Sequence, residues 1–192
     1  MTDTITILGM AGSLRQGSFN AALLRAAAAA APAGCTVAIA SLRGIPLYDG
    51  DVEAATGVPA VVEALKERVA AADGLLLVTP EYNNSIPGVF KNAIDWLTRP
   101  PADIPLVFKG RAVGLIGASP GMRGTVLSQT AWLPVLRTLG VQPWFEQLLY
   151  VGNADKVFDP SGKLIDEAIR TRLRTYVRGF ADFVRSLREG RR

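Results

Sequence analysis

The sequence predicts an α/β fold: a three-layer sandwich in which helices cover both faces of a five-stranded parallel sheet. Short aliphatic and β-branched runs alternate with longer helix-forming segments from end to end, and parallel neighbours need helical crossovers of this kind. The chain has 192 residues, of which 49% are hydrophobic, so it can fill one substantial core. We therefore expect one domain spanning residues 1–192.

The first part of the chain predicts two strand–helix units. Residues 4–9 form a β-branched and aliphatic run that ends in glycine, which is typical of a buried strand. Residues 19–31 are rich in Ala and Leu and predict a helix, which a proline and a glycine then end. Residues 36–40 predict the second strand. Residues 58–72 predict the second helix, because apolar side chains recur there at helical spacing.

The rest of the chain continues the alternation. Residues 74–79 are apolar almost throughout, as expected for a central strand that is covered on both faces. Helix, strand, helix, strand and helix then follow at residues 89–97, 112–118, 125–139, 144–151 and 165–187.

Composition excludes several classes of function. The chain has no histidine, which removes Ser-His-Asp and Cys-His catalysis and argues against a catalytic zinc site, so we expect no metal. Its only cysteine, Cys35, cannot form an internal disulfide and fits a reducing compartment. The N-terminus lacks the features of a secretion signal, and no segment approaches the ~20 apolar residues of a membrane span. We expect a cytoplasmic protein without a membrane partner.

The charge distribution argues against a nucleic-acid partner. The net charge is only +4, and acidic residues interrupt the arginines that gather late in the chain. No pattern of stacking aromatics accompanies these arginines. We therefore expect no binding of nucleic acid.

The loop at residues 9–20 has the composition of a phosphate-binding loop. In a parallel sheet of order 2-1-3-4-5, the loops after strands one, three and four meet at one edge, where ligands bind. Ser13 and Ser18 offer hydroxyls, Arg15 can pair with phosphate, and the following helix adds favourable potential. The loop matches neither GxxxxGK[ST] nor GxGxxG, so the terminal monophosphate of FMN fits best. The alternative is a tight turn in which Ser18 or Asn20 caps the helix.

The loop at residues 79–88 can support a flat ring. Two prolines stiffen it, and Tyr82 and backbone amides can face an isoalloxazine ring. The alternative is a surface turn built from the usual turn residues.

Two motifs together resemble a known family. They are Gly-Ser-Leu-Arg-x-x-Ser-x-Asn at residues 12–20 and Pro-Glu-Tyr-Asn-x-Ser-Ile-Pro-Gly-x-x-Lys-Asn-Ala-Ile-Asp-Trp at residues 80–96. In this order and spacing they resemble the flavodoxin-like NADPH-dependent FMN reductase family, which includes chromate, quinone and azo-dye reductases. The resemblance covers nearly the whole chain.

The resemblance implies a set of FMN contacts. Ser13, Arg15, Ser18 and Asn20 would hold the phosphate, and the loop at residues 80–83 would border the ring. The full expected set is Gly12, Ser13, Leu14, Arg15, Ser18, Phe19, Asn20, Pro80, Glu81, Tyr82, Asn83, Ser119 and Gly121.

The third flavin loop departs from the family pattern. The family usually has a Gly-Gly pair after Ser-Pro-Gly, whereas this chain has Gly124 and Thr125. A β-branched residue resists a positive φ, so the contact assigned to the second glycine is in doubt.

The implied reaction passes hydride from NADPH or NADH through FMN to a quinone, chromate, an azo compound or free flavin. The flavin carries this chemistry, so we expect no catalytic side chain. The resemblance also implies a homodimer or homotetramer, and the segment at residues 99–109 could supply a contact surface. The alternatives are a flavodoxin-type one-electron carrier without a nicotinamide site, which is usually strongly acidic, and a flavin-free protein that grips another phosphate.

Overall fold

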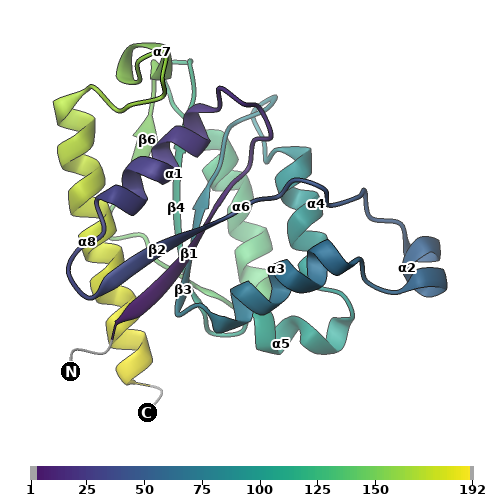
Figure 1. Ribbon diagram of the computed structural model, residues 1–192. Coiled ribbons are helices and arrows are strands. Elements are labelled where there is room, and N and C mark those ends of the chain that lie inside the picture. Colours follow the sequence, from purple (N-terminus) through teal and green to yellow (C-terminus); the bar gives the residue numbers. More distant parts are fainter. Residues whose placement is uncertain (1–3, 191–192) are drawn as a thin grey trace.

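The sheet has the predicted order. The computed structural model describes residues 4–190, and residues 1–3 and 191–192 of the expected domain lie outside the described residues. Its strands form one parallel sheet of order β2-β1-β3-β4-β5, with β6 also paired to β4 (Figure 1). The predicted α/β class and strand order are confirmed.

The four longest strands make up most of this sheet, and β2 lies at one edge. Every residue of β3 (Gly74–Val78) and β4 (Ala112–Ala118) is buried, as the apolar run at residues 74–79 predicts for β3. The four are β1 (Ile5–Ala11), β2 (Cys35–Ala40), β3 (Gly74–Val78) and β4 (Ala112–Ala118).

The expected strand at residues 144–151 is wrong in its extent. Two short strands stand in its place, β5 (Gln142–Pro143) and β6 (Leu149–Val151), and both pair with β4. The Trp144 side chain is buried, with its ring edge-on to Tyr176 at 5.0 Å between centroids. The edge is therefore interrupted where this ring packs into the core.

Helices cover both faces of the sheet (Figure 1). On one face, α1 (Phe19–Ala29) and α8 (Glu167–Glu189) pack their apolar side chains into a core that includes Leu23 and Phe180. The opposite core includes side chains of α3 (Ala60–Ala71), α4 (Gly88–Leu97) and α6 (Val126–Leu139). The carboxyl ends of the parallel strands lie at one edge of the sheet, and the loops that follow them gather there.

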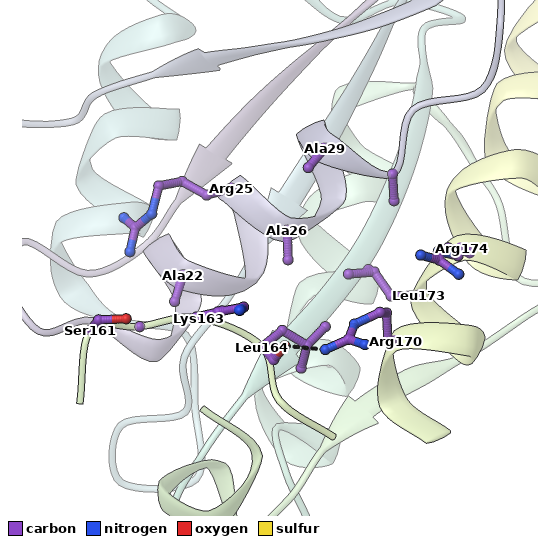
Figure 2. Close-up of a pocket in the computed structure, with 12 residues that line it drawn as sticks. Ala22, Arg25, Ala26, Ala29, Ser161, Lys163, Leu164, Arg170, Leu173 and Arg174 are labelled. Atoms are coloured by element: carbon purple, nitrogen blue, oxygen red, sulfur yellow. Dashed lines mark hydrogen bonds between the residues drawn. The ribbon is translucent and has the colours of Figure 1, made fainter. Parts of the chain in front are cut away.

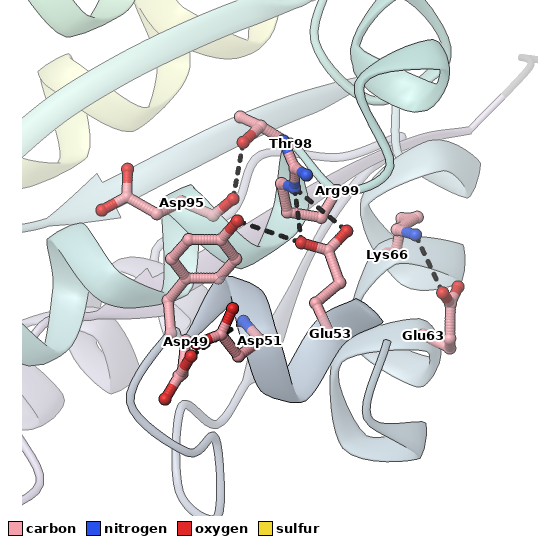
Figure 3. Close-up of polar contacts among 9 residues, drawn as sticks. Asp49, Asp51, Glu53, Glu63, Lys66, Asp95, Thr98 and Arg99 are labelled. Carbon is pink, nitrogen blue, oxygen red and sulfur yellow. Dashed lines mark hydrogen bonds and ion pairs between the residues drawn. The ribbon is translucent and has the colours of Figure 1, made fainter. Parts of the chain in front are cut away.

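Four short elements were not expected from the sequence: α2 (Gly50–Thr56), η1 (Pro101–Asp103), α5 (Ile104–Val107) and α7 (Ala154–Val157). Figure 1 shows α2 projecting from the body beyond α4, and none of its residues is buried. Polar contacts hold it instead (Figure 3). Arg99 Nε lies 2.8 Å from the carboxylate of Glu53 on α2, and the Tyr48 hydroxyl donates to the same carboxylate at 3.0 Å.

Candidate functional site

Three loops meet around a small hollow at the carboxyl ends of β1, β3 and β4. The hollow measures about 90 Å³, and we call it the cofactor hollow. Its lining residues are Ser13, Arg15, Ser18, Phe19, Asn20, Pro80, Glu81, Tyr82, Ala118, Ser119 and Pro120. Most of the residues expected to bind the cofactor are therefore brought together at one place.

The loop after β1 presents hydrogen-bond donors at the start of α1. Ser18 is the N-cap, and its Oγ accepts from the Ala21 amide at 3.1 Å, which leaves its hydroxyl hydrogen for a ligand. The Arg15 guanidinium donates one hydrogen bond to the Gly17 carbonyl at 2.8 Å and lies over the Phe19 ring. No acidic residue occupies the first turn of α1. Hydroxyl, guanidinium and helix amides are the donor set that suits a phosphate monoester.

Asn20 ties this loop to β4. Its amide nitrogen donates to the Ala118 carbonyl at 2.8 Å, and its amide oxygen accepts from the Ala118 nitrogen at 2.9 Å. Asn20 is buried, so this exchange fixes the start of α1 against the end of β4. One N–H of the amide remains for a phosphate oxygen.

The loop after β3 closes in a tight turn that positions Tyr82. Asn83 and Asn84 have φ of 49° and 62°, and Tyr82 and Ser85 exchange backbone hydrogen bonds of 3.2 and 3.1 Å. Two consecutive positive φ values define a type I′ turn, which Asn tolerates. Tyr82 is 48% exposed, and its hydroxyl donates to Ser13 Oγ at 3.2 Å. Tyr82 therefore bridges two loops at the rim of the cofactor hollow, while Asn83 lies exposed in the turn.

Glu81 connects the same loop to α6. One carboxylate oxygen accepts from the amides of Leu127 and Ser128 at 2.9 and 3.1 Å. The N-cap of α6, Thr125, makes no side-chain capping bond, so Glu81 satisfies amides that the helix would otherwise leave unpaired. Glu81 therefore stabilises the start of α6 and also lines the cofactor hollow.

The loop after β4 accommodates the unusual threonine. The positive φ falls on Gly124, at 62°, whereas Thr125 has a φ of −122°. Thr125 is fully buried, and its hydroxyl oxygen accepts a hydrogen bond from the Gln129 side-chain nitrogen, Nε2, at 3.0 Å. Ser119 Oγ accepts from the Gly121 amide at 3.2 Å, which closes the loop at the edge of the hollow. Thr125 therefore introduces no backbone strain.

Gly12 lies where the first loop meets the third strand's loop. Its amide donates to the Val78 carbonyl at 3.0 Å. A Cβ on Gly12 would lie 2.3 Å from the Phe90 ring and 3.0 Å from Pro80. Glycine is required by close packing, and not by a left-handed φ.

Two further hollows flank α1. One, of about 300 Å³, adjoins the end of β2 and includes Leu14 and Arg43; the Arg43 guanidinium donates to the Leu14 carbonyl. Arg43 was not among the residues expected from the sequence, although an arginine three residues after a predicted strand is a signal for this edge of the sheet. The other, about 650 Å³, lies between the alanine-rich face of α1 and the start of α8 (Figure 2). None of the expected cofactor-binding residues lines this larger hollow.

The structure also bears on metals and membranes. Within residues 4–190, no group of His, Cys, Asp and Glu side chains is arranged to hold a metal ion. The helices of this same region are too short or too polar to cross a membrane.

Comparison with known proteins gives a consistent result. Residues 5–156 match the model of a family described as NADPH-dependent FMN reductase. An NAD(P)H-dependent FMN reductase of Pseudomonas aeruginosa is 41% identical over 98% of this chain and 100% of its own length. A quinone reductase of Escherichia coli K12 is 38% identical over 98% of this chain and its own full length (100%). A 2-hydroxy-1,4-benzoquinone reductase of a Burkholderia species is 36% identical, covering 96% of this chain and 98% of that protein.

The solved structures agree with the sequence relatives. The flavoenzyme NAD(P)H:acceptor oxidoreductase FerB of Paracoccus denitrificans superposes with a TM-score of 0.84 at 32% identity. The match covers 95% of this chain and 98% of FerB.

Proposed function

Because the chain belongs to the NADPH-dependent FMN reductase family, we propose that it passes hydride from NAD(P)H through bound FMN to a quinone. The protein is an oxidoreductase that uses FMN and NAD(P)H, as its relatives do. The observation that carries the proposal is the meeting of three loops around a phosphate-type donor set, beside an exposed tyrosine ring. A quinone is favoured as the acceptor because two of the relatives are named for quinone reduction.

The proposed FMN contacts follow from the loops. Ser13, Ser18 and Arg15 would hold the phosphate at the start of α1, where the helix dipole favours an anion. Pro80 and Tyr82 would border the ring, with the third loop opposite them. When bound, FMN itself supplies the hydride chemistry, and the protein orients the ring and excludes water from one face.

We also propose that the protein is a homo-oligomer. Leu106 of α5, within the segment at residues 99–109, is 65% exposed, and Leu47 beside α2 is 83% exposed. Large exposed apolar side chains favour burial against a second copy of the chain. Light scattering on the purified protein measures the mass directly, and a monomer at micromolar concentration would contradict this proposal.

The visible spectrum of the purified protein tests the main proposal. We expect bound flavin that bleaches on anaerobic addition of NADPH or NADH and recovers its absorbance when benzoquinone is added. Chromate and an azo dye at the same concentration serve as competing acceptors. Flavin that neither nucleotide reduces would instead favour a one-electron carrier, and a colourless protein that refuses FMN would contradict the cofactor assignment.

A further inference from the structure

Three arginines surround the hollow beside the carboxyl end of β2. Arg15, Arg25 and Arg43 line this space of about 300 Å³, which we call the arginine hollow. None of its lining residues, all within the described part of the chain, is acidic. Three positive charges without a nearby carboxylate favour a small dianion over any neutral ligand.

Local contacts hold the guanidinium groups without exhausting their donors. Arg43 donates to the Leu14 carbonyl, and its amide donates to Ser41 Oγ at 3.1 Å. Arg15 gives one hydrogen bond to the Gly17 carbonyl at 2.8 Å. Since a guanidinium carries five N–H donors, both arginines retain several for a ligand. The hollow is therefore preorganised for the fork-like recognition of phosphate oxygens.

Arg43 follows β2, the edge strand that lies beside β1. It lies three residues after Ala40, the last residue of β2. In dinucleotide-binding α/β sheets whose first loop carries GxGxxG, an arginine near the ribose accommodates the 2′-phosphate of NADP. This chain lacks that motif, so only the pairing of an arginine with a 2′-phosphate applies here. Ile39, on the rim, is 44% exposed and offers apolar surface to a flat base.

The sheet order sets the distance to the flavin loops. β2 is followed by β1, β3 and β4, so three strand spacings separate the arginine hollow from the loop after β4. At ~4.8 Å per spacing this is about 14 Å. A nicotinamide dinucleotide placed over the flavin ring has to direct its adenosine half away from the ring, and this edge is within such a reach.

We propose that the arginine hollow holds the adenosine 2′-phosphate of NADPH and makes the enzyme prefer NADPH to NADH. The inference rests on the proposed function, because it assigns one half of the electron donor to this chain. Arg43 and Arg25 are the specificity-determining residues. Arg15 lines both the arginine hollow and the cofactor hollow, so it is unsuitable for a test.

Calorimetric titration of the FMN-loaded protein tests the site without turnover. Bound FMN fills its own phosphate loop, so an added nucleotide reports on the second site. We expect adenosine 2′,5′-bisphosphate to bind at least about tenfold more tightly than adenosine 5′-monophosphate, the usual effect of one charge-assisted contact. Equal binding of the two nucleotides would overturn the proposal.

Two variants locate the contact. Arg43→Gln removes the charge but keeps an N–H for the Leu14 carbonyl, and Arg25→Ala removes a side chain of α1 that also lines the hollow. Each should weaken the bisphosphate about tenfold and leave the monophosphate unchanged. In steady-state kinetics, KM for NADPH should rise by a similar factor, while kcat and KM for NADH stay constant.

The matched control is Arg174→Ala. Arg174 lines the larger hollow of Figure 2, as Arg25 also does, but not the arginine hollow. Arg174→Ala removes the same net charge as each of the two variants. It should change neither the affinity for adenosine 2′,5′-bisphosphate nor the affinity for adenosine 5′-monophosphate. Equal weakening by Arg174→Ala would overturn the proposal in favour of diffuse charge or the larger hollow.

These experiments distinguish failure of the 2′-phosphate site from failure of the reductase activity. If NADPH and NADH both reduce the flavin but Arg43→Gln changes KM equally for the two, the 2′-phosphate site is contradicted and the reductase activity is supported. If neither nucleotide reduces the flavin, the proposed function fails, and calorimetry still supports or overturns the 2′-phosphate site by itself.

Discussion

At the residue scale, close packing decides the identity of Gly12. Its α-carbon faces the Phe90 ring and Pro80, and both neighbours are buried. Gly17, five positions later in the same loop, has no heavy atom within 4 Å of the Cβ position. Close packing therefore requires glycine at position 12, whereas at position 17 there is space for a larger side chain.

Gly12→Ala should destabilise the protein by about 1–3 kcal/mol, the usual cost of forcing a methyl group into a packed core. The buried Phe90 ring has to move, because the new Cβ would lie 2.3 Å from it. Urea unfolding of the FMN-free protein measures the free energy of unfolding. Gly17→Ala is the control and should change it by no more than about 0.5–1 kcal/mol, with either sign. Equal losses for both variants would contradict the packing argument.

Arg15→Ala should weaken FMN binding about tenfold to a hundredfold. A hydrogen bond to a charged group contributes about 1.5–3 kcal/mol, and each 1.4 kcal/mol is about a factor of ten in affinity. Quenching of flavin fluorescence on titration into the FMN-free protein gives the dissociation constant. Arg178→Ala removes an exposed charge on α8 and should have no effect. Unchanged FMN affinity in Arg15→Ala would remove Arg15 from the phosphate site.

At the scale of elements, the hydrophobic pattern predicts those helices that apolar packing holds on the sheet. The predicted helices that pack on the sheet are present, because their apolar side chains recur at helical spacing. Helix α2 buries none of its residues, so no such pattern marks it. An Asp49 cap holds its start, and the pairing of Glu53 with Arg99 joins it to a segment 46 residues away, a contact that leaves no local signal.

In the candidate site, local motifs predict the binding loops but not the contacts between them. The motifs predict the loops after β1 and β3, because the chemistry of phosphate and ring binding is local to each loop. The roles of Glu81 and Thr125 in supporting α6 depend on tertiary contacts, as does the approach of Arg43 to Leu14. These contacts could not be predicted from the sequence without the fold.

Acid should release α2 from the body. Hydrogen bonds from Arg99, opposed by partial burial and helped by Tyr48, lower the pKa of Glu53. A lowered folded-state pKa means that the stabilisation is present above the ordinary carboxylate range and is lost as the pH falls below about 4. Hydrogen exchange of the amides at residues 50–56 should therefore accelerate relative to the core, after correction for the intrinsic effect of pH.

Variants separate Glu53 from the other acidic groups at α2. Asp49 caps the helix with a carboxylate of its own, so acid alone does not identify the residue. Glu53→Gln should loosen α2 already at pH 7, whereas Glu63→Gln, which removes a partner of Lys66 on α3, should not (Figure 3). Slow exchange of α2 in Glu53→Gln at pH 7 would show that the ion pair is dispensable.

At the scale of the whole molecule, strand order creates the site. The loops that follow β1, β3 and β4 are distant in sequence, and the parallel sheet brings their starts to one edge. Contacts between the loops then tie them together: Ser13 to Tyr82, and Asn20 to Ala118. A ligand that fills the cofactor hollow should therefore stabilise the whole fold, since unfolding any one of the loops disperses its contacts.

FMN should raise the melting temperature of the FMN-free protein, and riboflavin should raise it much less. At a hundred times the dissociation constant, a ligand that binds only the folded state adds about 2.7 kcal/mol. For a protein of this size that amounts to roughly 5–11 °C. Riboflavin has the same ring without the phosphate, so at equal concentration the difference between the two shifts measures what the phosphate loop contributes. In Arg15→Ala the two shifts should converge, because the variant loses the contact that only FMN can make. Equal shifts for both ligands in the unaltered protein would mean that the ring alone is recognised, and that the donors at the start of α1 serve another anion.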